Sequence, residues 1–402
     1  MLVHRGVSEL DLRVSHDVTL QILADENIPA VEYFFSGDTH VARLPGRAIG
    51  RAQLQHVDIL LVRSVTRVDA TLLSGTAVKF VGTATSGLDH IDQEYLCQSG
   101  IGFAYAAGSN ANSVVEYVLA AVASVADTLE KLLAGGVVGV VGYGHIGKAI
   151  AERLDALGIR YCVFDPRLQQ HTIKQAATLE QVLDCDVVTL HPELTTDEPW
   201  PSRHLLGIAE LSRLGPDSLL VNASRGPIID NMALLAHLRT GEGFSTVVDV
   251  WEGEPAINAA LLERVTLGTA HIAGYSLDGK LLATRMLSDA VKEWRHVQSA
   301  ALSSPAGTAP VLLLPEGFSR AQQIRYLLKS RYDISLDDAL LRQAILGEPI
   351  IEKRAQQFDQ LRKTYRSRRE LAGSLVRQSI PTAQQLEVIR ALNCIAVNLG
   401  DA

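Results

Sequence analysis

An apolar run that leads into closely spaced glycines occupies residues 137–147, where the sequence reads VVGVVGYGHIG. Its β-branched residues predict a buried strand, and the next residues, 148–154, predict a helix. Gly142 would allow the tight turn out of the strand, Gly144 would let a pyrophosphate approach the backbone, and Gly147 would let the helix pack closely on the strand. The helix N-terminus offers free N–H groups to phosphates. The G-x-G-x-x-G spacing therefore predicts a dinucleotide-binding turn.

Taken alone, this motif is weak evidence, because glycine turns join strands to helices in many α/β proteins. A second predicted strand, residues 160–164, ends at Asp165, which lies 18 residues after Gly147. An acid at about this distance accepts hydrogen bonds from the adenine ribose hydroxyls and repels the 2′-phosphate of NADP. Arg167 lies close enough to weaken this discrimination. The alternative is an ordinary turn with a capping aspartate, but the complete order of strand, glycines, helix, strand and acid favours NAD.

Composition excludes several classes of protein. A chain of 402 residues with 47% hydrophobic and 20% charged residues predicts two or three folded domains rather than disorder. The net charge of −8 and the lack of a long basic run argue against nucleic acid as a partner. The longest apolar stretch, residues 117–126, is too short to span a bilayer, so we expect no membrane partner.

The cysteines and the N-terminus indicate a cellular compartment. Four cysteines are scattered without a C-x-x-C pair, which fits a reducing cytoplasm and argues against a structural zinc, so we expect no metal. The N-terminus is polar and has no apolar signal core. We therefore expect a cytoplasmic protein. The cysteines are Cys97, Cys162, Cys185 and Cys394.

Alternating strand and helix patterns predict an α/β fold with doubly wound parallel sheets. In the first part of the chain the expected strands are 20–24, 59–63, 79–82 and 101–105. A long helix over 112–133 should lead to the glycine turn, and further strands are expected at 187–190, 219–222, 246–250 and 265–267. A second long helix, 278–297, would return the chain to the first domain.

A third segment is expected after a linker at 303–308. It should contain a strand at 311–314, helices at 320–329 and 352–371, and a last strand at 394–397. Because it has no obvious catalytic cluster, its default role is assembly. The expected domains are a discontinuous substrate domain (20–110 and 272–300), a Rossmann NAD domain (111–271) and a C-terminal α/β domain (305–402), with residues 1–19 as an extension of unknown role.

Three polar residues follow predicted strands in the second half of the chain: Arg225, Glu254 and His271. Ligands of open parallel sheets bind beyond the carboxyl ends of the strands, so all three should face that crevice. A histidine titrates near neutral pH and can take a hydroxyl proton while a hydride leaves the same carbon. A glutamate would orient the imidazole, and a guanidinium can bind a carboxylate bidentately. This set suits dehydrogenation of a 2-hydroxy acid.

Each of these three residues also has a simple structural explanation. Arg225 could close a loop, Glu254 could be a turn acid before a proline, and His271 could be a hydrogen-bonded core histidine. For any one of the three residues taken alone, the structural explanation is favoured over a catalytic role. Together, and downstream of a nucleotide-binding turn, the three residues favour catalysis.

The chain resembles the D-2-hydroxyacid dehydrogenase superfamily, in which an Arg, a Glu and a His in this order are catalytic. Within it, the chain is similar to a branch that acts on a four-carbon phosphorylated 2-hydroxy acid, on the route to pyridoxal 5′-phosphate. Stretches that carry the resemblance are 24–29 (ADENIP), 61–66 (LVRSVT), 80–90 (FVGTATSGLDH), 114–118 (VVEYV), 249–255 (DVWEGEP), 271–275 (HIAGY), 332–333 with 337–339, and 358–363 (FDQLRK).

The resemblance implies roles for matching residues. Arg225, Glu254 and His271 would be catalytic, with His271 as the proton donor in the reductive direction. Ser64, Thr85 and Tyr275 would contact substrate. The C-terminal domain would make a homodimer. Contacts to NAD would come from Gly142, Gly144, Ile146, Gly147, Asp165, Ala223, Ser224, Arg225, Asp249 and Gly274.

The sequence departs from this branch in two places and leaves some questions open. Residues 192–194 read Pro-Glu-Leu where relatives read Thr-Pro-Leu, which puts one cofactor contact in doubt, and residues 1–19 have no counterpart. The substrate phosphate needs cations, for which Arg63, Arg43, Arg47 and arginines of a partner's C-terminal domain are candidates. The alternatives are an enzyme of the same superfamily acting on 3-phosphoglycerate or hydroxypyruvate, and an NAD-sensing protein without turnover.

Overall fold

The structure, a computed structural model, describes residues 19–37, 39–241, 243–297, 305–307, 311–378 and 382–398. These residues form two compact units. Unit 1 comprises the described residues of Met1–Asn110 and Leu277–Thr308, and unit 2 those of Ala111–Ser276 and Ala309–Ala402. The expected extension at 1–19 lies outside the described residues except for Thr19, and the expected linker at 303–308 is described only at 305–307.

Unit 1 contains a five-stranded parallel sheet with the strand order β2-β1-β3-β4-β5. Its strands are β1 Leu20–Asp25, β2 Thr39–Leu44, β3 Ile59–Val62, β4 Phe80–Thr83 and β5 Gly102–Tyr105. Its helices are α1 Val31–Phe34, α2 Ala70–Leu73, α3 Gln93–Gln98 and α11 Leu277–Trp294, with 3-10 turns at Gly46–Ala48 and Arg51–Leu54.

Both faces of this sheet are buried. Along β3, Ile59 and Leu61 join one hydrophobic cluster, whereas Leu60 and Val62 join another on the opposite face. Helix α11 covers the first face, where the ring of Trp294 lies 5.2 Å from that of Phe80. Burial on two faces explains why these strands read as continuous apolar runs.

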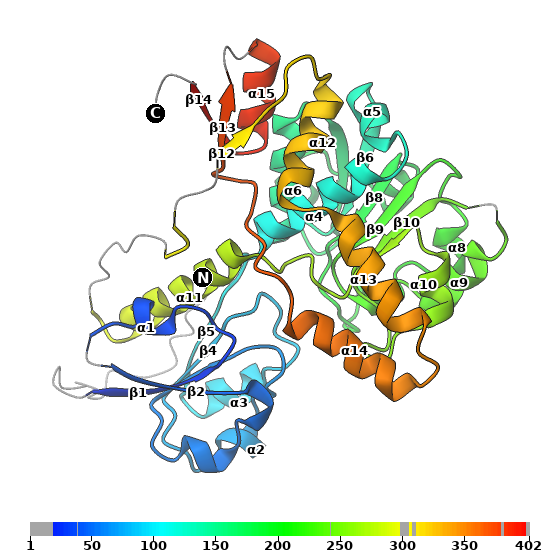
Figure 1. Cartoon of the computed structure of the whole chain (residues 1–402). Helices are drawn as coiled ribbons and strands as arrows, with labels where there is room; N and C mark the ends of the chain where they lie inside the picture. The colour runs from blue at the N-terminus through cyan, green and yellow to red at the C-terminus, as the bar shows by residue number, and fades with distance from the viewer. Residues whose placement is uncertain are drawn as a thin grey trace. The chain divides into compact units, whose positions relative to one another are not determined.

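Unit 2 contains a six-stranded parallel sheet in the order β11-β10-β9-β8-β6-β7. Figure 1 shows the helices of this unit on both sides of the sheet. The strands are β6 Val137–Val141, β7 Arg160–Phe164, β8 Val187–Leu190, β9 Leu219–Asn222, β10 Ser245–Val248 and β11 Leu267–Gly268. The helices are α4 Ala111–Ser124, α5 Thr128–Leu133, α6 His145–Ala156, α7 Leu179–Leu183, α8 Ile208–Leu211, α9 Asn231–Leu238 and α10 Ala259–Arg264, with 3-10 turns at Gln170–Thr172 and Gly226–Ile228. The predicted α/β class with two doubly wound parallel sheets is therefore confirmed.

The C-terminal part of unit 2 adds a small parallel sheet, β12-β13-β14, and four helices. Its strands are β12 Val311–Leu313, β13 Leu375–Gln378 and β14 Ile395–Asn398, and its helices are α12 Arg320–Arg331, α13 Ile334–Leu346, α14 Ile351–Lys363 and α15 Ala383–Ala391. Buried residues of α12, such as Ile324 and Leu327, belong to the same hydrophobic cluster as α4 and α6. The C-terminal helices therefore pack directly on the large sheet's helical layer (Figure 1).

Three predicted elements are wrong in extent. The helix expected over 112–133 is two helices, because Ala126 adopts a left-handed conformation (φ 42°) between α4 and α5. The helix expected over 352–371 ends at Lys363, and irregular chain follows to residue 370. The strand expected at 265–267 is only the two-residue β11, Leu267–Gly268.

Several elements were not predicted from the sequence. Strand β2 has alternating half-buried and exposed residues, because it is an edge strand, and its polar sequence THVARL lacks an apolar run. Helices α13 and α15 and strand β13 were also missed. Within the described residues, no helix is both long and apolar enough to cross a membrane.

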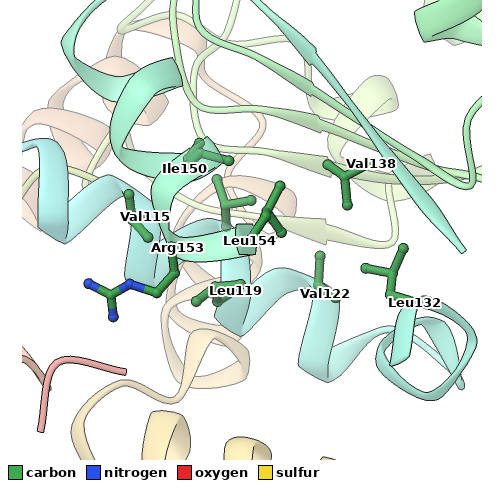
Figure 2. A pocket seen from close by; sticks show the side chains of 9 residues that line it. Val115, Leu119, Val122, Leu132, Val138, Ile150, Arg153 and Leu154 are labelled. Atoms are coloured by element: carbon green, nitrogen blue, oxygen red, sulfur yellow. The ribbon is translucent and has the colours of Figure 1, made fainter. Parts of the chain in front are cut away.

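A small pocket lies in the helical layer of unit 2 (Figure 2). Its lining is apolar except for Arg153, and it includes Val122 of α4, Ile150 of α6 and Val138 of β6. Val138 belongs to the N-terminal half of β6, at the other end of the strand from Gly142. This pocket is a packing gap beneath α6 and offers no group for chemistry.

Candidate active site

The strand order of unit 2 reverses direction between β6 and β8. The chain goes from β6 to β7 on one side and then crosses to β8 on the other, which makes this a topological switch point. Gly142 follows β6, and its amide hydrogen-bonds to the carbonyl of Phe164 at the end of β7 (2.8 Å). His191 follows β8 and donates from its backbone to Val141 O (2.7 Å). The glycine turn therefore lies where open α/β sheets bind ligands.

Each glycine of the turn meets a different spatial demand. Gly142 has φ 89°, a left-handed conformation, and a Cβ there would lie 2.6 Å from the nitrogen of Pro192. A Cβ on Gly147 would overlap the carbonyl oxygen of Gly142, so α6 packs against the turn only without a side chain. A Cβ on Gly144, which precedes α6, would meet no atom within 4 Å. Gly144 therefore leaves open space at the helix N-terminus.

Asp165 follows β7 and connects that strand to the glycine turn. Its Oδ2 accepts a hydrogen bond from the backbone N–H of Tyr143 (2.8 Å), and its Oδ1 accepts one from the N–H of Arg167 (3.0 Å). The carboxylate is half-buried. The guanidinium of Arg167 points instead to the 195–200 loop, where it donates to Thr195 Oγ1 (3.2 Å). Asp165 is thus fixed beside the open space at Gly144.

Arg225 lies in a tight loop after β9. Asn222, the last residue of β9, donates from Nδ2 to the carbonyl of Arg225 (3.1 Å) and accepts from the N–H of Ser224 (3.2 Å), which fixes the loop. Ser224 Oγ donates to the carbonyl of Pro192, so the altered 192–194 sequence still contacts this loop. The Arg225 guanidinium is half-buried and donates to Ser224 O (2.9 Å). Ala223 is buried beside these residues.

Glu254 and His271 form a hydrogen-bonded pair. Glu254 Oε2 lies 2.7 Å from His271 Nδ1, and Glu254 Oε1 accepts the backbone N–H of Trp251 (2.8 Å). Burial would raise the pKa of Glu254, but the adjacent imidazole, this N–H and the guanidinium of Arg362 lower it overall. An ionised carboxylate can only accept, so His271 carries its proton on Nδ1. The other ring nitrogen, Nε2, is left for proton exchange.

A buried aspartate positions the backbone around His271. The carboxylate of Asp249 is 1% exposed and accepts from Thr269 Oγ1 (2.6 Å), the N–H of Ile272 (2.7 Å) and the N–H of Ala273 (2.9 Å). Its carbonyl accepts the N–H of His271 (2.7 Å), which has φ 55°. These bonds hold His271 in a left-handed backbone conformation. Apart from Gly, Asn, Asp and His, few residues adopt this conformation readily.

The C-terminal segment also reaches this turn, a contact that the sequence did not predict. Arg362 of α14 donates from Nη2 to the hydroxyl of Tyr275 (3.2 Å), four residues after His271. Arg368, in the irregular chain after α14, donates to Ala273 O (2.7 Å). Glu370 Oε1 accepts from Ser276 Oγ (2.6 Å). Gly274 lies between the residues that the two arginines contact. The C-terminal segment, for which assembly was the default role, therefore contributes charged groups of the same chain here.

The remaining predicted residues belong to unit 1. Ser64 follows β3 and is exposed, and Thr85 follows β4, where its hydroxyl donates to Gly87 O (2.9 Å) and contacts Thr83 Oγ1 (2.8 Å). Both lie past the carboxyl ends of adjacent strands of their own sheet. Arg43, a candidate for phosphate binding, is engaged with Glu32 (Nε to Oε1 2.6 Å) and with two backbone carbonyls. The ion pair lowers the pKa of Glu32 to about 2.

Among the described residues, His204, Asp230 and Glu252 could bring three ligand atoms to one metal ion. His204 Nε2 is hydrogen-bonded to Glu252 Oε1 (2.7 Å), and Asp230 caps the N-terminus of α9. These existing partners account for all three side chains.

The four cysteines are free, with Cys162 Sγ and Cys185 Sγ 3.5 Å apart.

Comparison with known proteins identifies the family. The chain is 41% identical over 362 residues to erythronate-4-phosphate dehydrogenase of Cronobacter sakazakii, covering 87% of this chain and 92% of the relative. It is also 41% identical over 374 residues to the Salmonella paratyphi B protein of that name, covering 91% and 96%. The chain belongs to the erythronate-4-phosphate dehydrogenase family. It is thus an NAD-dependent 2-hydroxyacid dehydrogenase.

Domain families and solved structures agree with this assignment. Residues 110–273 match the family described as D-isomer specific 2-hydroxyacid dehydrogenase, NAD binding domain, and residues 312–392 match a domain of unknown function. The fold is similar to D-lactate dehydrogenase from Aquifex aeolicus (21% identity, TM-score 0.56, 68% of this chain and 95% of that one). It is also similar to 3-phosphoglycerate dehydrogenase of Entamoeba histolytica (20%, 0.59, 69% and 95%).

The geometry of unit 2 fits the cofactor that this family uses. The open space at Gly144 lies at the N-terminus of α6, where free N–H groups favour a pyrophosphate. Asp165 lies at the end of the neighbouring strand, the usual place of a ribose-binding acid. Gly142 and Gly147 shape the turn, and Ile146 is in the first turn of the helix.

Proposed function

We propose that this protein oxidises 4-phospho-D-erythronate at C2 with NAD, giving 2-oxo-3-hydroxy-4-phosphobutanoate, a step of pyridoxal 5′-phosphate biosynthesis. The observation that carries the proposal is the Glu254–His271 pair, at 2.7 Å, in the same unit as the glycine turn of an erythronate-4-phosphate dehydrogenase family member. An oriented histidine is the group that alcohol oxidation needs, because the hydroxyl proton must leave together with the hydride.

His271 acts as the acid/base. In the oxidative direction its Nε2 takes the C2 hydroxyl proton, and in the reductive direction it returns that proton. Glu254 accepts the Nδ1–H, which fixes the ring orientation and stabilises the imidazolium that forms. Asp249 holds the backbone of the turn, so the imidazole is preorganised before substrate binds. Bound NAD supplies the acceptor for the C2 hydride.

Arg225 binds the substrate carboxylate. A guanidinium matches a carboxylate with two parallel hydrogen bonds, and this one is half-buried on a loop that Asn222 fixes. Further proposed substrate contacts are Tyr275 in unit 2 and Ser64 and Thr85 in unit 1. Proposed cofactor contacts are Gly142, Gly144, Ile146, Gly147, Asp165, Ala223, Ser224, Arg225, Asp249 and Gly274.

The assembly and the location of the enzyme are also part of the proposal. We expect a homodimer formed through the C-terminal region, because α13 and α14 carry exposed apolar side chains, among them Leu336, Leu340 and Ile351. Light scattering after size-exclusion chromatography should give twice the chain mass, and the pair L336E and L340E should shift it to the monomer. Four free cysteines fit a reducing cytoplasm.

The test of the proposed reaction is NADH formation by the purified protein. 4-Phospho-D-erythronate should be preferred strongly over 3-phospho-D-glycerate and D-glycerate. A preference for 3-phosphoglycerate would move the protein to the neighbouring activity in the superfamily. Tight NAD binding without turnover of any of these acids would support an NAD sensor and contradict the proposal.

A further inference from the structure

Arg362 places a cation beside the catalytic turn. Its Nη2 donates to the Tyr275 hydroxyl (3.2 Å), and its guanidinium carbon lies 5.7 Å from the centre of the Tyr275 ring. Tyr275 is only four residues from His271, and its backbone N–H is bonded to Ile272 O (2.8 Å) within the same turn. The Arg362 side chain is therefore tied to the segment that carries the acid/base.

Among the described residues Arg362 has no ion-pair partner, whereas two other arginines of the C-terminal segment have one. Arg366 forms an ion pair with Asp337 (3.0 Å), and Arg342 forms one with Asp338 (2.9 Å). By contrast, the described residues give Arg362 only the neutral hydroxyl of Tyr275, and its buried Nε has no hydrogen-bond partner. A half-buried guanidinium without an anion is partly desolvated, and a ligand that supplies the anion would offset that cost.

The acids close to Arg362 are already occupied. Glu254 is hydrogen-bonded to His271 and to the backbone of Trp251, and Asp249 accepts three hydrogen bonds from its own turn. Burial would lower the pKa of Arg362, but Tyr275, Glu254 and Asp249 raise it overall, so the group stays charged. The Arg362 guanidinium thus lies near the Glu254–His271 pair. Among the described residues, no carboxylate is hydrogen-bonded to it.

We propose that Arg362 binds the phosphate at the distal end of the substrate and determines the preference for phosphorylated over unphosphorylated 2-hydroxy acids. This inference rests on the proposed oxidation of 4-phospho-D-erythronate. A guanidinium whose Nε has no hydrogen-bond partner and whose Nη2 has only a neutral hydroxyl suits the oxygens of a phosphate dianion. Arg225 then keeps the carboxylate, and the two arginines bind opposite ends of one small molecule.

The competing explanation is that Arg362 only stacks on Tyr275 and braces the turn. In that case its loss would impair all substrates equally. A phosphate-binding role predicts a loss confined to phosphorylated substrates. The two explanations therefore differ in the ratio of kcat/KM values for 4-phospho-D-erythronate and D-erythronate, which share the carboxylate and the reacting C2 hydroxyl.

The experiment compares R362M and R362K with the unaltered enzyme as purified full-length proteins. For R362M, kcat/KM for 4-phospho-D-erythronate should fall about a hundred- to thousandfold, as expected when one partner of a desolvated charge pair is removed. The value for D-erythronate should change less than about threefold. R362K keeps the charge without the planar fork, so its kcat/KM for 4-phospho-D-erythronate should lie between those of R362M and the unaltered enzyme. NADH binding, followed by fluorescence, should be unchanged in both variants.

R366M is the matched control, since Arg366 is close in sequence and also lies over a tyrosine ring (Tyr365, 5.6 Å) but has an acidic partner. It should keep the phosphate preference. An equal loss on both substrates in R362M, or an unchanged preference, would overturn the inference while leaving the proposed reaction intact. If the unaltered enzyme does not oxidise 4-phospho-D-erythronate, the proposed function itself fails, and the inference fails with it.

Discussion

Glu254 Oε2 and His271 Nδ1 lie 2.7 Å apart, although 17 positions separate the two residues in the chain. The same unit contains a second pair of this kind, Glu252 and His204, also at 2.7 Å. Both histidines adopt left-handed backbone conformations, with φ 55° for His271 and 52° for His204. Only the first pair is adjacent to the Asp249 turn and to Arg362. The second pair therefore provides an internal control for the first.

Replacing His271 by Asn should lower kcat by about two to four orders of magnitude, because the acid/base is lost. Asn tolerates the left-handed conformation, so the backbone should keep its geometry. NADH affinity should stay within a fewfold of the original value. Steady-state kinetics and fluorescence titration test both points. H204N should leave kcat unchanged, and full activity of H271N would contradict the assignment.

Replacing Glu254 by Gln should lower kcat by about tenfold to a thousandfold, less than loss of the histidine itself. A neutral amide no longer stabilises the imidazolium and can turn its NH₂ toward Nδ1, which disfavours the productive tautomer. The measurement is kcat at saturating substrate, with E252Q as control. A comparable loss in E252Q would show that the effect is structural and would remove the proposed role of Glu254.

Two glycines of the nucleotide turn should respond in opposite ways. In G144A the added methyl group meets no atom within 4 Å, so the thermal midpoint should hold while NADH affinity falls at least about tenfold, because the methyl group enters the space for the pyrophosphate. In G147A the Cβ would overlap Gly142 O, so the fold itself should be destabilised. Calorimetry and NADH titration distinguish the two. Unchanged NADH affinity in G144A would argue against binding at this turn.

The Asp249 turn should be a stability element as well as a positioning one. In D249N, one of the oxygens that accept from Thr269, Ile272 and Ala273 becomes an NH₂ donor, which costs about 1–3 kcal/mol for each unsatisfied buried group. Both the urea midpoint and kcat should fall. T269V removes only the hydroxyl that bridges Asp249 and Tyr117 and should cost less. Loss of activity without loss of stability in D249N would contradict the stability role and leave only the proposed cofactor contact.

Local sequence patterns predicted much of unit 2, because the relevant signals lie within short windows. The glycine turn, strand β7 with Asp165 and the strands β8 and β9 could be predicted from apolar runs and turn residues. The break at Ala126 could not, because neither glycine nor proline marks it. Arg362 could not be placed either, since its contact with Tyr275 spans 87 positions and depends on how α14 packs. Tertiary packing, rather than local propensity, determines these features.

The helix predicted over 352–371 illustrates the same limit. Residues 352–363 do form a helix, but the chain after it is irregular, and there Arg368 and Glu370 contact Ala273 and Ser276. Just beyond them, the backbone N–H groups of Leu371 and Ala372 donate to the distant Glu116 carboxylate rather than to helical carbonyls. Helix-favouring composition alone gives no sign of that exchange.

Glu116 should make stability depend on pH. It is 5% exposed, and burial together with the nearby Glu370 raises its pKa to about 7, although backbone N–H groups of Leu371 and Ala372 and the guanidinium of Arg368 oppose the rise. Between pH 4.5 and about 7 the folded state therefore binds more protons at this site than the unfolded state. The contribution of Glu116 to the free energy of unfolding should thus decrease as pH rises through this window.

The test is the difference in unfolding free energy between the unaltered protein and E116Q, from urea titrations at pH 5, 6, 7 and 8. Gln keeps an oxygen that can accept from Leu371 and Ala372 but does not titrate. Between pH 5 and 8, the unfolding free energy of the unaltered protein should fall by up to about 3 kcal/mol relative to that of E116Q. Most of this fall should occur below pH 7. E130Q, at an exposed ion pair with Arg325, should show no such shift over this range. A pH-independent difference for E116Q would mean that Glu116 is ionised throughout, held by its backbone N–H donors and the neighbouring arginines.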